Sequence, residues 1–346
     1  MPTLNQTYNI RQNNNLKEQR MSYEWELVHP DTTRDELNKA IQHEFPNKFI
    51  VTHDAQWGRH SNYSEIKNSD SFVAKGNEAI TAWTEMLSYI NDRFNIESRE
   101  NTGFHIHFDT IGFSPKDLSN VITFYWNHNS IINLIMQRSR RENVRHVNSL
   151  YYRDVKRIQD LARIHMKRKY DSEAERNAEF WDVLSSSNLR NHYQELSLSP
   201  NFRTLEFRRH VFTKDSRKFQ NWVLICQNMI KKCKRRKTFT RIYTQHEKTT
   251  MLEKWRDEQF VFDYFGKNEC SWSIVSQMKG NVYLWRQFAE YCGQNETLRN
   301  YFERRCVTLN RAGGIDATRA ELINGFSEYI KNHYTNIRSR KYKPAN

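Results

Sequence analysis

Polar, metal-capable side chains alternate with apolar ones in four short segments of this sequence. The segments are 22–28 with Glu24 and Glu26, 63–66 with Glu65, 103–109 with His105 and His107, and 202–212 with Glu206 and Arg208. A repeat of two is the period of a β-strand, so each pair of charged side chains would share one strand face. A carboxylate that faces inward without a partner is costly, so these groups must share cations or bases.

This set of residue types suits phosphoryl transfer. The glutamates supply hard oxygen ligands of the kind magnesium prefers, and the histidines could join them or bind phosphate. Arg208, two residues after Glu206, would put a positive fork beside the metal and neutralise charge on a transferred phosphoryl group. A one-metal hydrolase fits less well, because the carboxylates outnumber what one ion needs.

Neighbouring residues extend this site. Asp109 shares the predicted strand face of the two histidines, which favours a functional site there. Arg203, Arg209 and His210 flank the pair formed by Glu206 and Arg208, and they favour an anionic ligand.

The elements that would position these strands can also be predicted. Apolar spacing indicates a strand at 49–52 and helices at 77–94 and 218–232. Ser114 followed by Pro115 is typical of a helix start, and the apolar run continues to Met136. On segment 22–28 the face opposite the glutamates would pack against helices.

Composition sets outer limits. The chain has 346 residues, enough for a full core, and a formal charge of +14 that would attract nucleotides, nucleic acids or acidic proteins. Its five cysteines are widely spaced with no C-x-x-C pair, which favours a reducing compartment. Without a signal-type segment or a long uncharged apolar run, we expect a cytoplasmic protein with no membrane partner.

Taken together, the four segments resemble the amidoligase family, a branch of the superfamily of glutamine synthetase and glutamate–cysteine ligase. The resemblance lies in Glu24-Trp25-Glu26, Ser64-Glu65-Ile66, Gly103-Phe104-His105-Ile106-His107 and Thr204-Leu205-Glu206-Phe207-Arg208, in this order. One departure is Ser22-Tyr23, where family members usually carry glycine before the first acidic pair.

The resemblance implies an α+β fold with a curved antiparallel sheet of the glutamine synthetase type and helices on its convex side. The concave face would hold ATP and two or more Mg²⁺ ions. ATP would phosphorylate a substrate carboxylate, and an amine would then attack the acyl phosphate to form an amide.

Residue roles follow from the same resemblance. The implied metal ligands are Glu24, Glu26, Glu65, Glu206 and His105. The implied catalytic residues are Arg208, Glu206 and His105, and the implied nucleotide-binding residues are His107, Arg138, Arg140 and Arg141. The three arginines resemble the basic stretch that follows the histidine strand in this family.

The predicted organisation has three parts. Residues 1–20 form a polar tail, residues 21–240 the catalytic domain, and residues 241–346 a mainly helical extension. The partners would be a carboxylate and an amine substrate, and the basic charge admits an acidic protein or a nucleic acid as acceptor.

A first alternative is a DNA nickase. His105-Ile106-His107 also has the form of the His-hydrophobic-His strand of rolling-circle replication and relaxase enzymes, in which two histidines hold one metal. Tyr151 or Tyr152 would be the nucleophile, with Lys156 close by. This alternative leaves Glu24, Glu26 and Glu206 without a role.

A second alternative is a nucleic-acid-binding protein without enzymatic activity. It would use the basic segments Arg138–Lys169 and Lys231–Lys237 with their interleaved Tyr and Phe residues. Its binding would weaken steeply with salt, and it would turn over no ATP.

Overall fold

The computed structural model describes residues 19–53, 62–99, 101–136, 140, 147–186, 194–199 and 203–247. The chain divides into two compact units, Met1–Trp126 with Gln137–Ile242, and Asn127–Met136 with Tyr243–Asn346. The sheet and the candidate site lie in the first unit. No helix among the described residues is long and apolar enough to cross a membrane.

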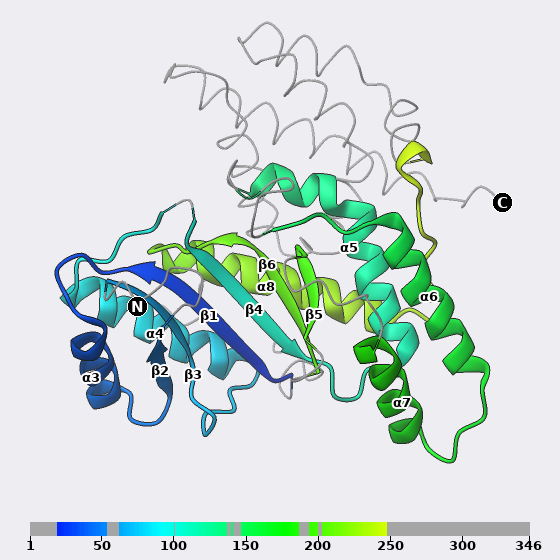
Figure 1. Cartoon of the computed structure of the whole chain (residues 1–346), viewed down its shortest axis with the longest axis horizontal. Helices are drawn as coiled ribbons and strands as arrows, with labels where there is room; N and C mark the ends of the chain where they lie inside the picture. The colour runs from blue at the N-terminus through cyan, green and yellow to red at the C-terminus, as the bar shows by residue number, and fades with distance from the viewer. Residues whose placement is uncertain are drawn as a thin grey trace, which may run out of the picture. The chain divides into compact units, whose positions relative to one another are not determined.

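The alternating segments form one antiparallel sheet of six strands in the order β2-β3-β1-β4-β6-β5 (Figure 1). Its strands are β1 Met21–Val28, β2 Phe49–Thr52, β3 Tyr63–Asn68, β4 Gly103–Asp109, β5 Leu196–Ser199 and β6 Thr204–Val211. The strands that carry the predicted site residues, β3, β1, β4 and β6, are therefore consecutive neighbours. The five predicted strands and helices 77–94, 114–136 and 218–232 are present, with ends shifted by a few residues.

One face of the sheet is covered by α4 (Gly76–Arg93) and α8 (Ser216–Lys234), which lie behind it in Figure 1. Tyr23 and Trp25 of β1 reach into this layer, and the Trp25 ring lies 4.6 Å from that of Trp83 and 5.4 Å from that of Phe219. Edge-on aromatic contacts of this kind each add about 1 kcal/mol to the burial of the rings. The prediction that this face of β1 meets helices is confirmed.

The remaining helices are α3 Arg34–Glu44, α5 Pro115–Ile135, α6 Tyr152–Lys167 and α7 Glu173–Ser186. Both α3 and α5 begin with a reciprocal cap. Thr33 Oγ1 accepts from Glu36 N at 3.3 Å, and Ser114 Oγ accepts from Asp117 N at 3.2 Å. The start of α5 at Ser114 and Pro115 was predicted, whereas α3, α7 and the short strand β5 were not.

The fold is a mixed α and β structure built on an antiparallel sheet, as predicted. The curved glutamine synthetase type of this sheet stays a prediction. Most of the predicted tail, residues 1–18, and nearly all of the predicted helical extension, from residue 248 onward, lie outside the described residues.

Candidate active site

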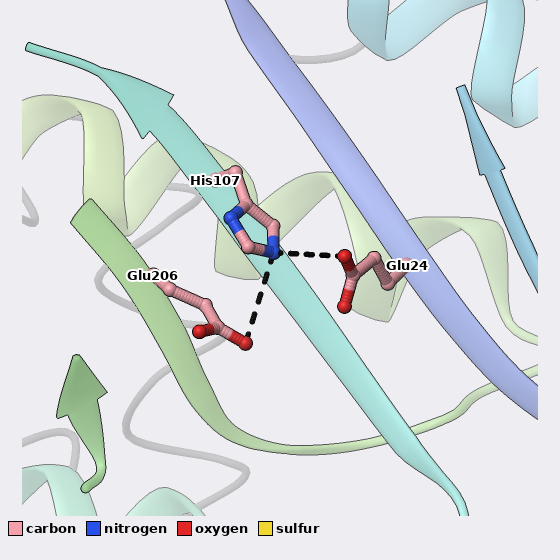
Figure 2. A group of neighbouring side chains, drawn as sticks. All are labelled: Glu24, His107 and Glu206. Carbon is pink, nitrogen blue, oxygen red and sulfur yellow. Dashed lines mark ion pairs between the residues drawn. The ribbon is translucent and has the colours of Figure 1, made fainter. Parts of the chain in front are cut away.

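The face of the sheet opposite α4 and α8 carries a three-residue group. Figure 2 shows Glu24 of β1, His107 of β4 and Glu206 of β6 pointing toward one another from three adjacent strands. One ligand atom from each residue lies within 4.8 Å of the others. Two carboxylate oxygens and one imidazole nitrogen at this spacing could hold a divalent cation.

His107 is oriented for such a role. Its Nε2 atom lies 3.2 Å from Glu24 Oε1 and 3.7 Å from Glu206 Oε1, and it has no hydrogen-bond partner among the described residues. Its other nitrogen, Nδ1, lies 3.2 Å from the Thr204 hydroxyl, which can fix the orientation of the ring. A buried imidazole nitrogen that faces two carboxylates fits a metal ligand.

His105 connects the carboxylates beside this group. Its Nδ1 atom lies 3.3 Å from Glu24 Oε2 and 3.5 Å from Glu206 Oε1, while its Nε2 atom lies 3.6 Å from Glu26 Oε1. The ring is 2% exposed, so these contacts are made away from water. His105 therefore holds both glutamates of the three-residue group in place and links them to Glu26.

Glu26 belongs to the other end of the site. Its Oε2 atom accepts a hydrogen bond of 2.5 Å from Gly103 N and lies 3.9 Å from Arg140 Nη2. A Cβ atom on Gly103 would lie 2.6 Å from His105 Nε2 and 2.7 Å from Glu26 Oε2, closer than side chains can approach. The glycine of the Gly103-Phe104-His105 motif therefore makes room for this contact.

The electrostatics favour a charged pair between Glu24 and His107. Burial alone would raise the pKa of Glu24, but His107 and His105 outweigh it and hold this pKa well below its usual range. Burial alone would lower the pKa of His107, yet Glu24 and Glu206 raise it to about 9. In the metal-free protein, His107 is therefore an imidazolium at neutral pH.

Arg208 lies beside Glu206, and its Nη1 atom donates a hydrogen bond to Glu206 Oε1. Both side chains are nearly fully buried. Arg140, also buried, donates from Nη2 to the Asn101 carbonyl at 2.9 Å. Burial lowers the pKa of Arg140 although Glu26 opposes this shift, and the charge of Arg208 adds to it.

A β-bulge in β6 places Arg209 and His210 differently from the prediction. Phe104 pairs with His210 and Ile106 with Phe207, so Arg208 and Arg209 together oppose the single residue His105. The extra residue turns His210 to the helix-covered face, where its ring lies 5.7 Å from that of Phe104.

Arg209, the second arginine of the bulge, also lies away from the three-residue group. Arg209 Nε lies 2.5 Å from Glu195 Oε2 in a fully buried pair, and Arg203 is an exposed residue 3.8 Å from Asp182. The expectation that Arg203, Arg209 and His210 help to bind the anionic ligand is therefore wrong for Arg209 and His210.

Glu65 lies next to the site but outside the three-residue group. Its Oε1 atom lies 3.3 Å from Lys67 Nζ and accepts a 3.3 Å hydrogen bond from Thr52. Burial and the charge of Glu24 raise its pKa, against the effect of Lys67. Two other predicted residues, Arg138 and Arg141, lie outside the described residues.

A pocket of about 400 Å³ is bordered by two members of the three-residue group, Glu24 and His107. Glu24 and His107 form one wall, and the other walls come from the start of β1, from Asp109 and from the loop that follows β3. The site therefore has an open side at the pocket and an arginine side at Arg140 and Arg208.

A family model described as "Putative amidoligase enzyme" matches residues 71–230. This segment is therefore similar to the amidoligase family. No curated protein matches the chain. The amidoligase match includes the strands that carry His107 and Glu206, while Glu24 and Glu65 precede it.

The amidoligase assignment agrees with the geometry better than the nickase alternative does. A nickase needs a tyrosine beside the histidines. Tyr152 instead packs against Trp126, with 6.3 Å between ring centroids, and Tyr151 is 51% exposed at the start of α6. Neither lines the pocket that His107 borders.

Two residues with structural roles in the site were not predicted. Gly103 and Thr204 both stand inside the motifs that suggested the family, so the signal was present. Their roles depend on which atoms they approach across strands, and these approaches appear only once β4 has been paired with β1 and β6.

Proposed function

We propose that this protein is an ATP-dependent carboxylate–amine ligase that forms an amide bond through an acyl phosphate. The observation that carries the proposal is the convergence of Glu24, His107 and Glu206 from three neighbouring strands, with Arg208 paired to Glu206. This arrangement puts cation-binding oxygens and a guanidinium within one small site, and phosphoryl transfer requires both.

The metal ligands would be Glu24, His107 and Glu206. The fit is supported by the buried Nε2 atom of His107, which has no hydrogen-bond partner among the described residues and faces both carboxylates. Magnesium, when bound, supplies positive charge that neutralises phosphate oxygens. The mixed donor set also suits manganese.

Arg208 and Arg140 would bind the phosphoryl group from the buried side. Each carries a buried Nε atom with no hydrogen-bond partner among the described residues, so each retains a donor for an anion. A guanidinium in a buried site stabilises negative charge on phosphate oxygens more strongly than one in water. Arg208 is the main candidate because it touches a proposed metal ligand.

His105 and Glu26 would position the reacting groups. His105 contacts Glu24, Glu26 and Glu206, and it therefore sets the distances between the carboxylates. Glu26 holds Arg140 at 3.9 Å, which keeps that guanidinium on the phosphate side. Glu65 would contribute negative charge at the edge of the site.

The proposed reaction has two steps. A carboxylate oxygen of the substrate attacks the terminal phosphorus of ATP, a new oxygen–phosphorus bond forms, and ADP leaves. The amine nitrogen then attacks the carbonyl carbon of the acyl phosphate, inorganic phosphate leaves, and the nitrogen gives up a proton. Arg208 and Arg140 would hold the phosphoryl oxygens in both steps.

The test uses hydroxylamine as a small amine that traps acyl phosphates. The protein is incubated with ATP, Mg²⁺, hydroxylamine and pools of carboxylates, and hydroxamate and ADP are measured together. We expect hydroxamate that depends on one pool and falls about a hundredfold or more in Arg208→Gln. No carboxylate-dependent ADP in any pool, combined with metal-dependent nicking of single-stranded DNA, would overturn the proposal in favour of the nickase.

A further inference from the structure

The pocket beside the three-residue group has mixed charge. Within about 400 Å³ it is lined by two basic residues, Arg20 and Lys67, and by the carboxylates Asp70 and Asp109 in addition to Glu24. Lys67 is partly neutralised by Glu65 at 3.3 Å. A pocket of this size suits one small molecule, and a macromolecule could enter it only with a side chain or a chain end.

Asp109 is held rigidly where the pocket meets the sheet. Its backbone N donates to the Arg20 carbonyl at 3.1 Å, and its carbonyl accepts a 2.5 Å hydrogen bond from Gln19 Nε2. Its Oδ1 atom accepts from Ile111 N at 2.7 Å, and among the described residues the carboxylate makes no other hydrogen bond or ion pair, although the charge of Arg20 acts on it. Asp109 Oδ2 is therefore in a position to accept a hydrogen bond from a ligand.

Asp109 also lies at a useful distance from the proposed metal ligands. It shares a face of β4 with His107, two residues away, and strand geometry puts such residues about 7 Å apart. A nitrogen bound to Asp109 would lie within reach of an acyl group held at His107 and Glu24. Arg20 lies on the neighbouring chain segment, where its carbonyl accepts the hydrogen bond from Asp109 N. A cationic and an anionic residue are therefore adjacent.

The wall formed by the loop after β3 is also fixed. Asn68 Nδ2 donates to the Phe72 carbonyl at 3.0 Å, and Asn68 Oδ1 accepts from Trp83 Nε1 at 2.9 Å. Met21 N donates to the Ala74 carbonyl at 3.1 Å, which ties the loop after β3 to the start of β1. The pocket is therefore a formed site rather than a gap under a loose loop.

We infer that this pocket binds the amine substrate, and that this substrate is an amino acid whose ammonium group contacts Asp109 and whose carboxylate contacts Arg20. The inference rests on the proposed function and assigns the substrate class of its second step. Asp109 is half-buried and Arg20 is exposed beside it. A molecule that carries both an ammonium and a carboxylate group can contact both side chains, whereas a molecule with one of these groups can contact only one of them.

The experiment compares the amino acids with matched molecules that lack one group. Amide formation is measured with each natural amino acid, with the corresponding decarboxylated amines and with the corresponding acids without nitrogen. Hydroxamate formation under the same conditions serves as the reference for the first step. We expect one or a few amino acids to be used about tenfold or more better than their decarboxylated amines.

Two variants test the assigned contacts. In Asp109→Asn the hydrogen bond to Ile111 N can be kept, and the ratio of amide to hydroxamate should fall about ten- to a hundredfold through a higher KM for the amino acid. In Arg20→Gln the KM should rise for the amino acid and stay unchanged for its decarboxylated amine. Asp160→Asn, an exposed residue of α6, is the matched control.

The possible failures can be distinguished. Equal use of amino acids and decarboxylated amines, or an unchanged amide to hydroxamate ratio in Asp109→Asn, would overturn the inference while the ligase remains. Absence of hydroxamate would overturn the proposed function. In that case, binding of the amino acids without ATP is measured by ligand-observed NMR, and binding lost in Asp109→Asn would retain the pocket assignment, whereas no binding would reject it.

Discussion

Glu24 on β1 bridges two histidines of β4, with Oε1 at 3.2 Å from His107 Nε2 and Oε2 at 3.3 Å from His105 Nδ1. Of the two histidines, His105 lies directly opposite Glu24 in the strand register, and the contact to His107 is diagonal. One carboxylate thus connects the histidine of the three-residue group to the histidine that contacts Glu26 and Glu206. A substitution at His105 should therefore change the position of Glu24 and so its contact with His107.

Glu24→Gln should weaken metal binding more than Glu65→Gln. Both substitutions replace a carboxylate by an amide on neighbouring strands, but only Glu24 belongs to the three-residue group. Titration with Mn²⁺ by calorimetry should show a Kd at least about tenfold higher for Glu24→Gln and a change of about threefold or less for Glu65→Gln. Equal losses would mean that Glu65 is also a ligand.

The pH dependence of stability should reveal His107. Its folded pKa of about 9 lies above the value of an unfolded histidine, so its contribution is complete below about pH 6.5 and is lost as pH rises through 9. In the presence of a chelator, the free energy of unfolding of wild type minus that of His107→Asn should fall by on the order of 3 kcal/mol over this range. Urea unfolding at several pH values measures this difference in the free energy of unfolding. A difference that does not change with pH would contradict the charged pair of His107 and Glu24.

Gly103→Ala should damage the site. The added methyl group would lie 2.6 Å from His105 Nε2 and must displace His105 or Glu26. We expect loss of about 1 to 3 kcal/mol in stability and a drop of about tenfold or more in hydroxamate formation.

Gly112→Ala is the control for this substitution. Gly112 has a φ of +75° with nothing within 4 Å of the added methyl group, so it should lose about 1 kcal/mol in stability through backbone strain alone. Its hydroxamate formation should match that of wild type at a temperature where both variants are folded. Similar activity losses in both variants would indicate a general effect on folding.

Arg209→Met should destabilise the protein without involving the ligands of the site. It would leave Glu195 as a fully buried charge without its 2.5 Å partner, at a cost of about 3 to 5 kcal/mol. Arg203→Met makes the same change at a side chain that is 50% exposed, and it should cost about 0.5 kcal/mol or less. The midpoints of urea unfolding compare the two.

The sequence predicted the faces of the strands because alternation depends only on neighbouring residues. Glu24 and Glu26 do share one face while Tyr23 and Trp25 pack against helices. Which residues would meet was not predictable, since it depends on how each strand is aligned with the next. Glu206 lies beside His107, and not beside Glu26, because the register of β4 and β6 pairs His107 with Glu206.

Other features left no readable pattern. The bulge that turns His210 away from the site falls at Arg208-Arg209-His210, where three polar residues in a row interrupt the alternation without showing which of them leaves the site. Strand β5 has only four residues, Leu196–Ser199, too few for periodicity to distinguish it from a loop. Asp109 was expected near the histidines, but its place in a pocket depends on the loop after β3, which folds back onto the start of β1.

The bulge in β6 makes this strand tolerant of a change in length at one point. Arg208 and Arg209 share the space opposite His105, while Phe207 and His210 keep regular partners on either side. Loss or gain of one residue there would be absorbed between two fixed pairs, so the strand could exchange an arginine without moving Glu206. A one-residue change in length at this point of β6 would thus alter the charge beside the site and leave its framework in place.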